Sequence, residues 1–177
     1  SIVIKTDSYY IDNNLIRFLS IFIYDIYDRP LSIKKKELHK TIRSIYNKNR
    51  LISNYKYDFK RKHSSQSKIR INYKGDYQFL IVEGIFAHRL DLNYEETINI
   101  VCEEEKEICL NRRLKRDQLE RDRDSRDVYK KFNKSWYLYY LNIKDYLKRS
   151  KVLSINPLDE ISYNKLVSHL QKLKKNN

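Results

Sequence analysis

The chain has 177 residues, 41% of them hydrophobic and only two each of Gly and Pro, which excludes a low-complexity chain and fits one globular domain over residues 1–177. Its formal net charge of +14 favours an anionic partner, but lysine is spread along the whole chain, so the charge alone does not identify that partner. No apolar run is long enough to span a bilayer, and Cys102 and Cys109 match no zinc or disulfide pattern, so we expect buried reduced thiols in a cytoplasmic protein without a membrane partner.

The first half of the chain predicts strands that alternate with helices. A β-branched run at residues 2–4 predicts a buried strand, with Asp7 at its carboxyl end. Residues 33–48 place apolar side chains at helical spacing and predict an amphipathic helix. Residues 49–76 look irregular, with short extended pieces at 54–59 and 69–73. A nearly continuous apolar run at 78–82 predicts a second buried strand.

The second half continues the alternation of short strands with longer helices. The expected strands cover residues 98–102 and 151–155, and the expected helices cover 104–121, 128–149 and 158–174. Short buried strands separated by helices are typical of βαβ units, in which helices cover both faces of a parallel sheet. We therefore expect an α/β fold.

Two carboxylates fall at the carboxyl ends of predicted strands, where ligands bind in open α/β sheets. Glu83 follows the apolar run at 78–82 in the segment IVEGI, a Walker-B arrangement in which a carboxylate orients the hydration shell of Mg²⁺. Asp7 could accept a proton from a substrate hydroxyl, and the neighbouring Tyr10 could pack on a substrate ring. Taken separately, a solvated glutamate and an N-capping aspartate remain alternatives.

Residues 111–127, NRRLKRDQLERDRDSRD, interleave guanidinium and carboxylate groups. Arg113 and Arg116 would share one helix face, and Arg121 and Arg123 fall where the helix should end. Such arginines can clamp a polyphosphate through paired hydrogen bonds. The interleaved carboxylates make a nucleic-acid groove unlikely on charge grounds, and they suit pairs that hold single arginines. A solvated helix with internal ion pairs is the alternative.

Five segments, taken in order, resemble motifs of the uridine kinase (uridine–cytidine kinase) family of P-loop kinases. They are TDSYY at 6–10, YDRP at 27–30, YDF at 57–59 followed by His63, IVEGI at 81–85, and RRLKRD…ERDRD between 112 and 124. The resemblance covers most of the chain and implies a P-loop kinase-like three-layer fold with a mostly parallel sheet. It also implies a helical, arginine-rich lid over about residues 112–130, and ATP and Mg²⁺ as cofactors.

The resemblance also implies roles for individual residues. Asp7 would be the general base on the 5′-hydroxyl of a nucleoside, Arg113 would lie near the transferring phosphoryl group, and Glu83 would organise Mg²⁺ through water. Arg116 and Arg121 would reach the ATP phosphates. The substrate-binding residues would be Tyr10, Tyr27, Asp28, Tyr57, Phe59, His63 and Arg123.

The chain departs from the family pattern in several places. No Walker A motif G-x-x-x-x-G-K-[ST] and no Met is present, so we expect the P-loop and the first strand upstream of Ser1, and poor stability for these 177 residues alone. Lys131 stands where the family has a base-reading Gln, and Asp122 stands between two arginines where it has Gly. The acceptor therefore stays open.

The sequence leaves three functions open. The first is ATP-dependent phosphoryl transfer to a nucleoside resembling uridine or cytidine. The second is a sister activity, as in phosphoribulokinase or pantothenate kinase, on a phosphorylated sugar or a vitamin precursor. The third is non-catalytic binding of a nucleotide or RNA by a basic remnant. The oligomeric state is not predicted, and a homo-oligomer is compatible with the sequence.

Overall fold

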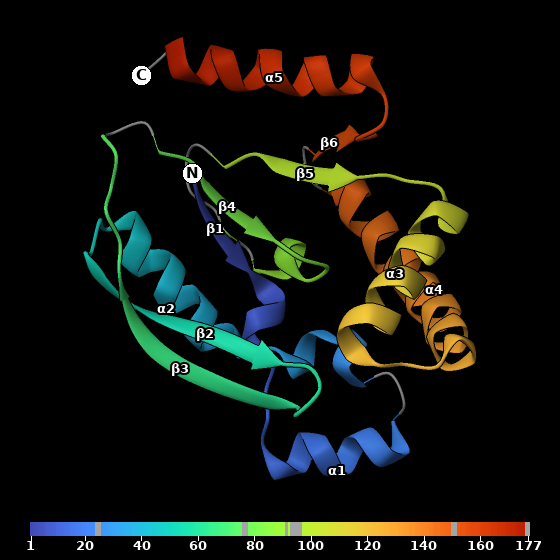
Figure 1. Ribbon diagram of the computed structural model, residues 1–177. Helices are drawn as coiled ribbons and strands as arrows, with labels where there is room; N and C mark the ends of the chain where they lie inside the picture. The colour runs from blue at the N-terminus through green and yellow to red at the C-terminus, as the bar shows by residue number, and fades with distance from the viewer. Residues whose placement is uncertain (24–25, 76–77, 91, 93–96, 150–151, 176–177) are drawn as a thin grey trace. The chain divides into compact units, whose positions relative to one another are not determined.

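The computed structural model describes residues 1–23, 26–75, 78–90, 92, 97–149 and 152–175 (Figure 1). Its contacts divide the chain into two compact units, an N-terminal unit, Ser1–Asp91, and a C-terminal unit, Leu92–Asn177. The N-terminal unit holds β1 (Ile2–Lys5), α1 (Asn14–Phe22), α2 (Lys35–Tyr46), β2 (Leu51–Asp58), β3 (His63–Arg70) and β4 (Leu80–Glu83). The C-terminal unit holds β5 (Asn99–Cys102), α3 (Lys106–Arg121), α4 (Ser125–Arg149), β6 (Val152–Ile155) and α5 (Glu160–Lys175).

The first and second expected strands are confirmed and pair with each other. β1 and β4 run parallel, in a register that places Ile2 beside Leu80 and Lys5 beside Glu83. A short 3₁₀ turn, Thr6–Tyr9, follows β1 directly and carries Asp7. Because the strands are parallel, their carboxyl ends lie at the same edge of the pair, as expected.

The expected helix over residues 33–48 is confirmed as α2, which packs on β2 (Figure 1). Leu38 and Ile42 of α2 are almost completely buried and belong to the core of this unit. The other buried apolar side chains of the unit are Ile4, Tyr9, Tyr10, Ile16, Ile26, Ile33, Ile45, Ile52, Tyr55, Tyr57, Phe86 and Leu90.

The prediction that residues 49–76 are irregular is wrong. β2 and β3 form an antiparallel hairpin of eight residues a side, in a register from Leu51 beside Arg70 to Asp58 beside His63. Its turn is fixed by Asp58, whose Oδ1 accepts hydrogen bonds from the backbone N–H groups of Lys60 and Arg61, both at 2.9 Å. α1 is a further element that the sequence analysis did not predict.

The C-terminal unit contains the remaining expected elements, displaced by one to three residues at their ends. β5 and β6 form a second parallel pair, and α3 and α4 lie side by side (Figure 1). The most buried apolar side chains of this unit are Val101, Val128, Phe132, Ile143 and Ile155. Both cysteine thiols were expected to be buried, but Cys102 on β5 is exposed and Cys109 on α3 is only half-buried.

The described strands therefore form a mixed α/β fold with three two-stranded sheets, two of them parallel, and not one larger sheet. Short parallel pairs and helices are compatible with the expected kinase-like fold. Within the described ranges, none of the helices has the length and apolar character that crossing a membrane requires.

Candidate functional site

The N-terminal unit brings two predicted site residues to one edge of the β1–β4 pair. Asp7 lies in the turn that follows β1, and Glu83 is the last residue of β4, beside Lys5. The Glu83 carboxylate is half exposed and lies 4.0 Å from the Lys5 ammonium group. This ion pair is solvated and contributes little to stability. The edge is therefore open to a ligand beside a carboxylate on each strand.

Gly84 makes the close approach of the two strand ends possible. Its φ of +134° lies in a region that L-residues rarely adopt, and a Cβ at this position would overlap the Thr6 hydroxyl. Thr6 is completely buried, and its hydroxyl oxygen has no hydrogen-bond partner among the described residues. A buried polar atom without a partner is costly, so this hydroxyl is suited to a polar ligand at the edge.

Replacing Gly84 with alanine is expected to lower the free energy of unfolding by about 3 kcal/mol, from backbone strain and overlap with Thr6. Chemical denaturation measures the loss. Gly75, at φ +70° with no atom near a built Cβ, is the matched control, and its alanine variant should lose about 1 kcal/mol. Equal losses at the two glycines would contradict a specific role of the Thr6 contact.

The residues at this edge fit a hydrated magnesium ion. Mg²⁺ prefers oxygen ligands and keeps several waters, so one or two carboxylates suffice when phosphates complete its shell. Glu83 supplies an exposed carboxylate there, and Thr6 supplies a hydroxyl. No group of three or more His, Cys, Asp or Glu side chains suited to a metal occurs among the described residues, so a complete protein cage is not found there.

Four aromatic rings predicted to bind substrate gather in one cluster, the aromatic cluster. Tyr10 is its centre, with ring centroids 5.8 Å from Tyr27, 5.3 Å from Tyr57 and 6.0 Å from Phe59. Tyr57 also contacts Phe59 at 5.1 Å and Tyr27 at 6.5 Å. Most of these pairs are edge-to-face, the geometry that aromatic quadrupoles favour.

The aromatic cluster contains phenol groups in an apolar setting. Burial, followed by the neighbouring Tyr27 phenol, raises the pKa of Tyr57, so Tyr57 remains neutral at physiological pH. The Tyr27 hydroxyl is buried next to the Tyr57 phenol. The cluster therefore combines apolar ring faces with a polar group to which a ligand could hydrogen-bond.

His63 lies beside the cluster and is held by a side chain that sequence reasoning missed. Its Nδ1 lies 3.2 Å from an oxygen of Asp12, which also accepts a hydrogen bond of 2.8 Å from the Ser64 backbone N–H. The Lys34 ammonium group lies 3.5 Å from Asp12 and donates a 2.8 Å hydrogen bond to the Ser64 hydroxyl. Burial acts to raise the pKa of Asp12, but these donors and cations lower it overall, so the carboxylate is ionised and anchors the ring.

In the C-terminal unit, the four predicted arginines converge on one carboxylate, that of Asp117, which is completely buried. Arg116 donates two hydrogen bonds to Oδ1 at 2.9 and 2.7 Å, and Arg123 donates one to Oδ2 at 3.2 Å. Arg113 and Arg121 lie within ion-pair distance, at 3.8 and 3.6 Å. We call these four residues with Asp117 the arginine cluster.

The end of α3 is built around the same residue. Asp122 adopts a left-handed conformation with φ +52°, and the backbone N–H groups of Asp122 and Arg123 both point to the Asp117 carbonyl oxygen. Asp117 therefore binds the arginines through its side chain and fixes the turn that carries Arg123 through its backbone. Although burial opposes ionisation, the surrounding arginines, Arg116 first, lower the pKa of Asp117.

A model of the phosphoribulokinase/uridine kinase family matches residues 23–154, well over half of the chain. The chain belongs to this family. No curated protein matches it. Membership implies kinase-type phosphoryl transfer, and kinases of this family generally use ATP and Mg²⁺.

The family match includes all predicted site residues except Asp7 and Tyr10, which precede residue 23. The Asp28 side chain lies outside the described part of the structure, so its predicted role in substrate binding stays a prediction. Lys131, which replaces the base-reading Gln of the kinase pattern, donates a 2.7 Å hydrogen bond to Asp127 one turn earlier on α4. Arg112, which is not part of the arginine cluster, pairs with Glu104 at 3.3 Å.

Proposed function

We propose that this kinase transfers the γ-phosphoryl group of ATP to the 5′-hydroxyl of a pyrimidine nucleoside. The observation that carries the proposal is the aromatic cluster beside an anchored His63. The half-buried rings of Tyr27 and Phe59 can pack on a planar base over the buried Tyr10 and Tyr57, and the Tyr27 hydroxyl and the His63 imidazole can hydrogen-bond to its edge. A sugar phosphate would not need this apolar aromatic surface.

The chain connects the aromatic cluster to the proposed base. Tyr10, the centre of the cluster, lies three residues after Asp7, and both belong to the segment that leaves β1. A nucleoside bound at the aromatic cluster would therefore have its ribose near the strand edge. There the Asp7 carboxylate would accept the proton of the attacking hydroxyl. The position of Asp7 in the turn after β1 supports its proposed role as the general base.

The remaining residues would position ATP and stabilise charge. Glu83 and Thr6 would hold the hydration shell of Mg²⁺, whose chemistry in kinases is to neutralise the phosphate oxygens. Arg113, Arg116 and Arg121 would donate to phosphate oxygens, and Arg123 would contact the ribose. Asp117 offsets only one of four positive charges, so the arginine cluster keeps a net charge that suits a polyphosphate.

A substrate panel tests the proposal with Mg²⁺-ATP and the protein encoded by the complete reading frame. We expect turnover with uridine or cytidine and at least tenfold lower kcat/KM with a sugar phosphate or pantothenate. Preference for either of the latter would overturn the proposed acceptor and favour the sister kinases. Tight RNA binding without turnover would favour the nucleic-acid alternative.

Replacing Asp12 with alanine is expected to raise KM for the nucleoside about tenfold and leave KM for ATP unchanged. The variant frees the His63 ring to rotate and removes the acceptor of the Ser64 N–H, which costs about 1–2 kcal/mol of hydrogen bonding. Steady-state kinetics at saturating ATP measure the effect. Asp12→Asn is the conservative control, because its amide oxygen can still accept from His63. A rise of both KM values together would indicate a general loss of structure instead.

A further inference from the structure

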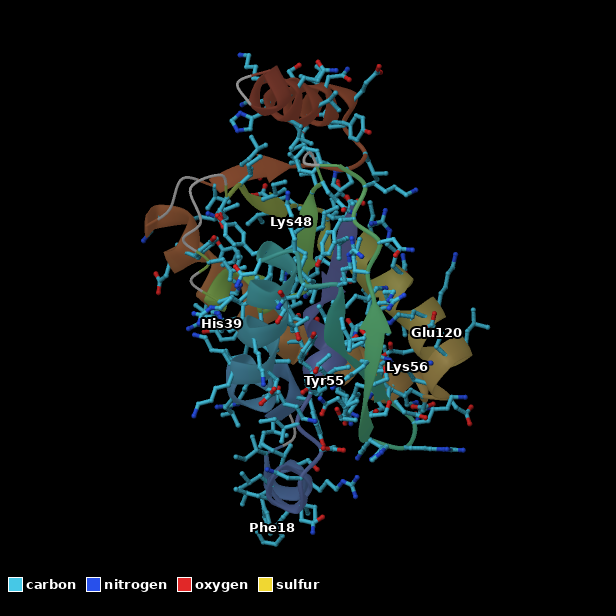
Figure 2. The ribbon with its side chains drawn as sticks, turned by 90° about the vertical axis from the view of Figure 1, so that its left-hand side faces the viewer. Phe18, His39, Lys48, Tyr55, Lys56 and Glu120 are labelled. Carbon is cyan, nitrogen blue, oxygen red and sulfur yellow. The ribbon has the colours of Figure 1, made fainter. Side chains whose placement is uncertain are left out.

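A hollow of about 480 Å³ lies in the N-terminal unit, at the end of the hairpin away from its turn. Its lining residues are Lys48, Arg50, Arg70, Ile71, Asn72 and Tyr73. The strand register places Arg70 beside Leu51, whereas His63 of the site described above pairs with Asp58 at the other end. Figure 2 shows Lys48 at one end of the hairpin, and Tyr55 and Lys56 toward the other.

The hollow concentrates positive charge. Of the lining side chains that the structure describes, three are cationic and none is acidic. Among the described residues, no carboxylate lies within ion-pair distance of the Arg50 or Arg70 guanidinium group. Two guanidinium groups on one concave surface repel each other unless an anion joins them, and arginine binds phosphate oxygens through paired N–H donors.

The backbone around the hollow is fixed by hydrogen bonds, and it includes Lys48 in a conformation that is unfavourable for a lysine. Lys48 follows α2 in the left-handed region with φ +55°, a position that helix ends usually give to glycine and that costs another residue about 1 kcal/mol. Three backbone hydrogen bonds of 2.9 Å, donated by Asn47, Lys48 and Asn49, fix this turn. Across the hollow, the Tyr73 hydroxyl donates a 2.8 Å hydrogen bond to the Asn49 carbonyl. Lys48 therefore belongs to a wall of the hollow whose backbone is fixed by these hydrogen bonds.

We propose that this hollow, the basic pocket, is a second anion site that binds the phosphate groups of a small phosphorylated molecule. Arg50, Arg70 and Lys48 bind the phosphate oxygens. The Asn72 amide and the Tyr73 ring contact the organic part. The volume lies within the range of small-molecule sites. This proposal goes beyond the kinase reaction, because none of these residues belongs to the site described above.

Charge along the hairpin favours a small ligand over a nucleic acid. Between the basic pocket and the turn, the hairpin strands carry only two further cations, Lys68 beside Ser53 and Lys56 beside Ser65. A nucleic-acid strand that followed the hairpin would meet these two isolated cations, although such binding depends on successive charge contacts. The cations are instead gathered where the surface is concave.

Site-resolved NMR of the full chain with inorganic pyrophosphate tests the proposal without requiring turnover. The backbone amide signals of Arg50, Ile71 and Asn72 should shift and saturate. The arginine cluster can also bind pyrophosphate, but its signals come from other residues, those of α3 and Arg123, and can be followed separately. Failure of the basic pocket would therefore leave the kinase proposal standing.

The variant Arg50→Gln/Arg70→Gln should weaken the binding seen at Asn72 at least tenfold. The matched control is Lys56→Gln/Lys60→Gln, which removes the same charge from exposed positions near the turn and should change the affinity less than twofold. Equal losses in both variants, shifts that never saturate, or tighter binding of a single-stranded RNA with shifts along the whole hairpin would each overturn the proposal. Melting temperatures of the variants check that they fold.

Discussion

Replacing Asp7 with asparagine is expected to lower kcat by about 10²–10⁴-fold, with KM for ATP and for the nucleoside nearly unchanged. Asparagine preserves the size of the side chain and its contacts in the turn after β1. Its amide cannot accept the proton of the attacking hydroxyl at neutral pH. The loss should therefore appear in the chemical step alone, measured by single-turnover phosphoryl transfer with Mg²⁺-ATP.

The control for this experiment is Asp145→Asn, which removes one carboxylate from an exposed position of α4 and should leave kcat within twofold. Both variants remove one negative charge, so a difference between their kcat values reports the effect of the position of the carboxylate. Turnover of Asp7→Asn within tenfold of the native protein would show that another group accepts the proton. A fall in melting temperature above a few degrees would attribute the loss to the fold instead.

The strand edge that carries Asp7 was predictable because short-range signals determine it. The β-branched run at residues 2–4 and the apolar run before Glu83 each predict a buried strand, and β1 and β4 confirm the strands. Their predicted burial is wrong, because Ile4 alone of their described residues is buried and Val3 and Ile81 are exposed. Parallel strands share their carboxyl edge, so the two carboxylates were expected together. The need for Gly84 was only partly predictable, since its contact with Thr6 depends on how closely the strands approach.

The hairpin was not predictable from periodicity. β3 reads HSSQSKIR, is exposed along nearly all of its length, and therefore has no apolar face for a pattern to show. In β2 the buried residues are Ile52, Tyr55 and Tyr57, which is not strict alternation. The turn also lacks the usual glycine, because Lys62 takes the left-handed position and Asp58 supplies the capping oxygen. Pairing with β2 overrides the weak local preference of β3.

The supporting residues of the site were mostly missed because they are distant in sequence from what they hold. Asp12 and His63 are separated by fifty-one positions, and only the hairpin brings them together. The aromatic side chains were proposed from a motif resemblance, and their mutual packing around Tyr10 comes from the structure. For the arginines, interleaved carboxylates suggested local pairs, but composition could not show that all four arginines share Asp117.

Replacing Asp117 with alanine is expected to lower the free energy of unfolding by about 3–5 kcal/mol, the usual cost of removing one partner from a buried charge cluster. The carboxylate is completely buried among four guanidinium groups, and its loss leaves like charges facing each other. Chemical denaturation measures the loss. Glu120→Ala is the matched control, because Glu120 lies exposed on the same helix (Figure 2) and should cost less than 0.5 kcal/mol.

The pH dependence of stability provides a second measure. The pKa of Asp117 is lowered in the folded protein, so its contribution is complete above the unfolded value of about 3.9 and is lost as the pH falls through the folded value. Asp117→Asn, which cannot ionise, should therefore show a smaller loss of stability below about pH 4 than the native protein. An identical loss of stability below about pH 4 in the variant and the native protein would show that the arginines do not stabilise the ionised carboxylate.

The kinetic effect of Asp117→Asn separates positioning of the arginines from general stability. The amide oxygen can still accept a hydrogen bond from Arg116, so the fold is retained, but the charge that gathers Arg113, Arg121 and Arg123 is gone. We expect KM for ATP to rise at least tenfold and kcat to fall, while KM for the nucleoside stays within twofold, because the aromatic cluster belongs to the other unit. An unchanged KM for ATP would show that Asp117 only stabilises the turn after α3, and the phosphate-binding role of the arginines would lose its support.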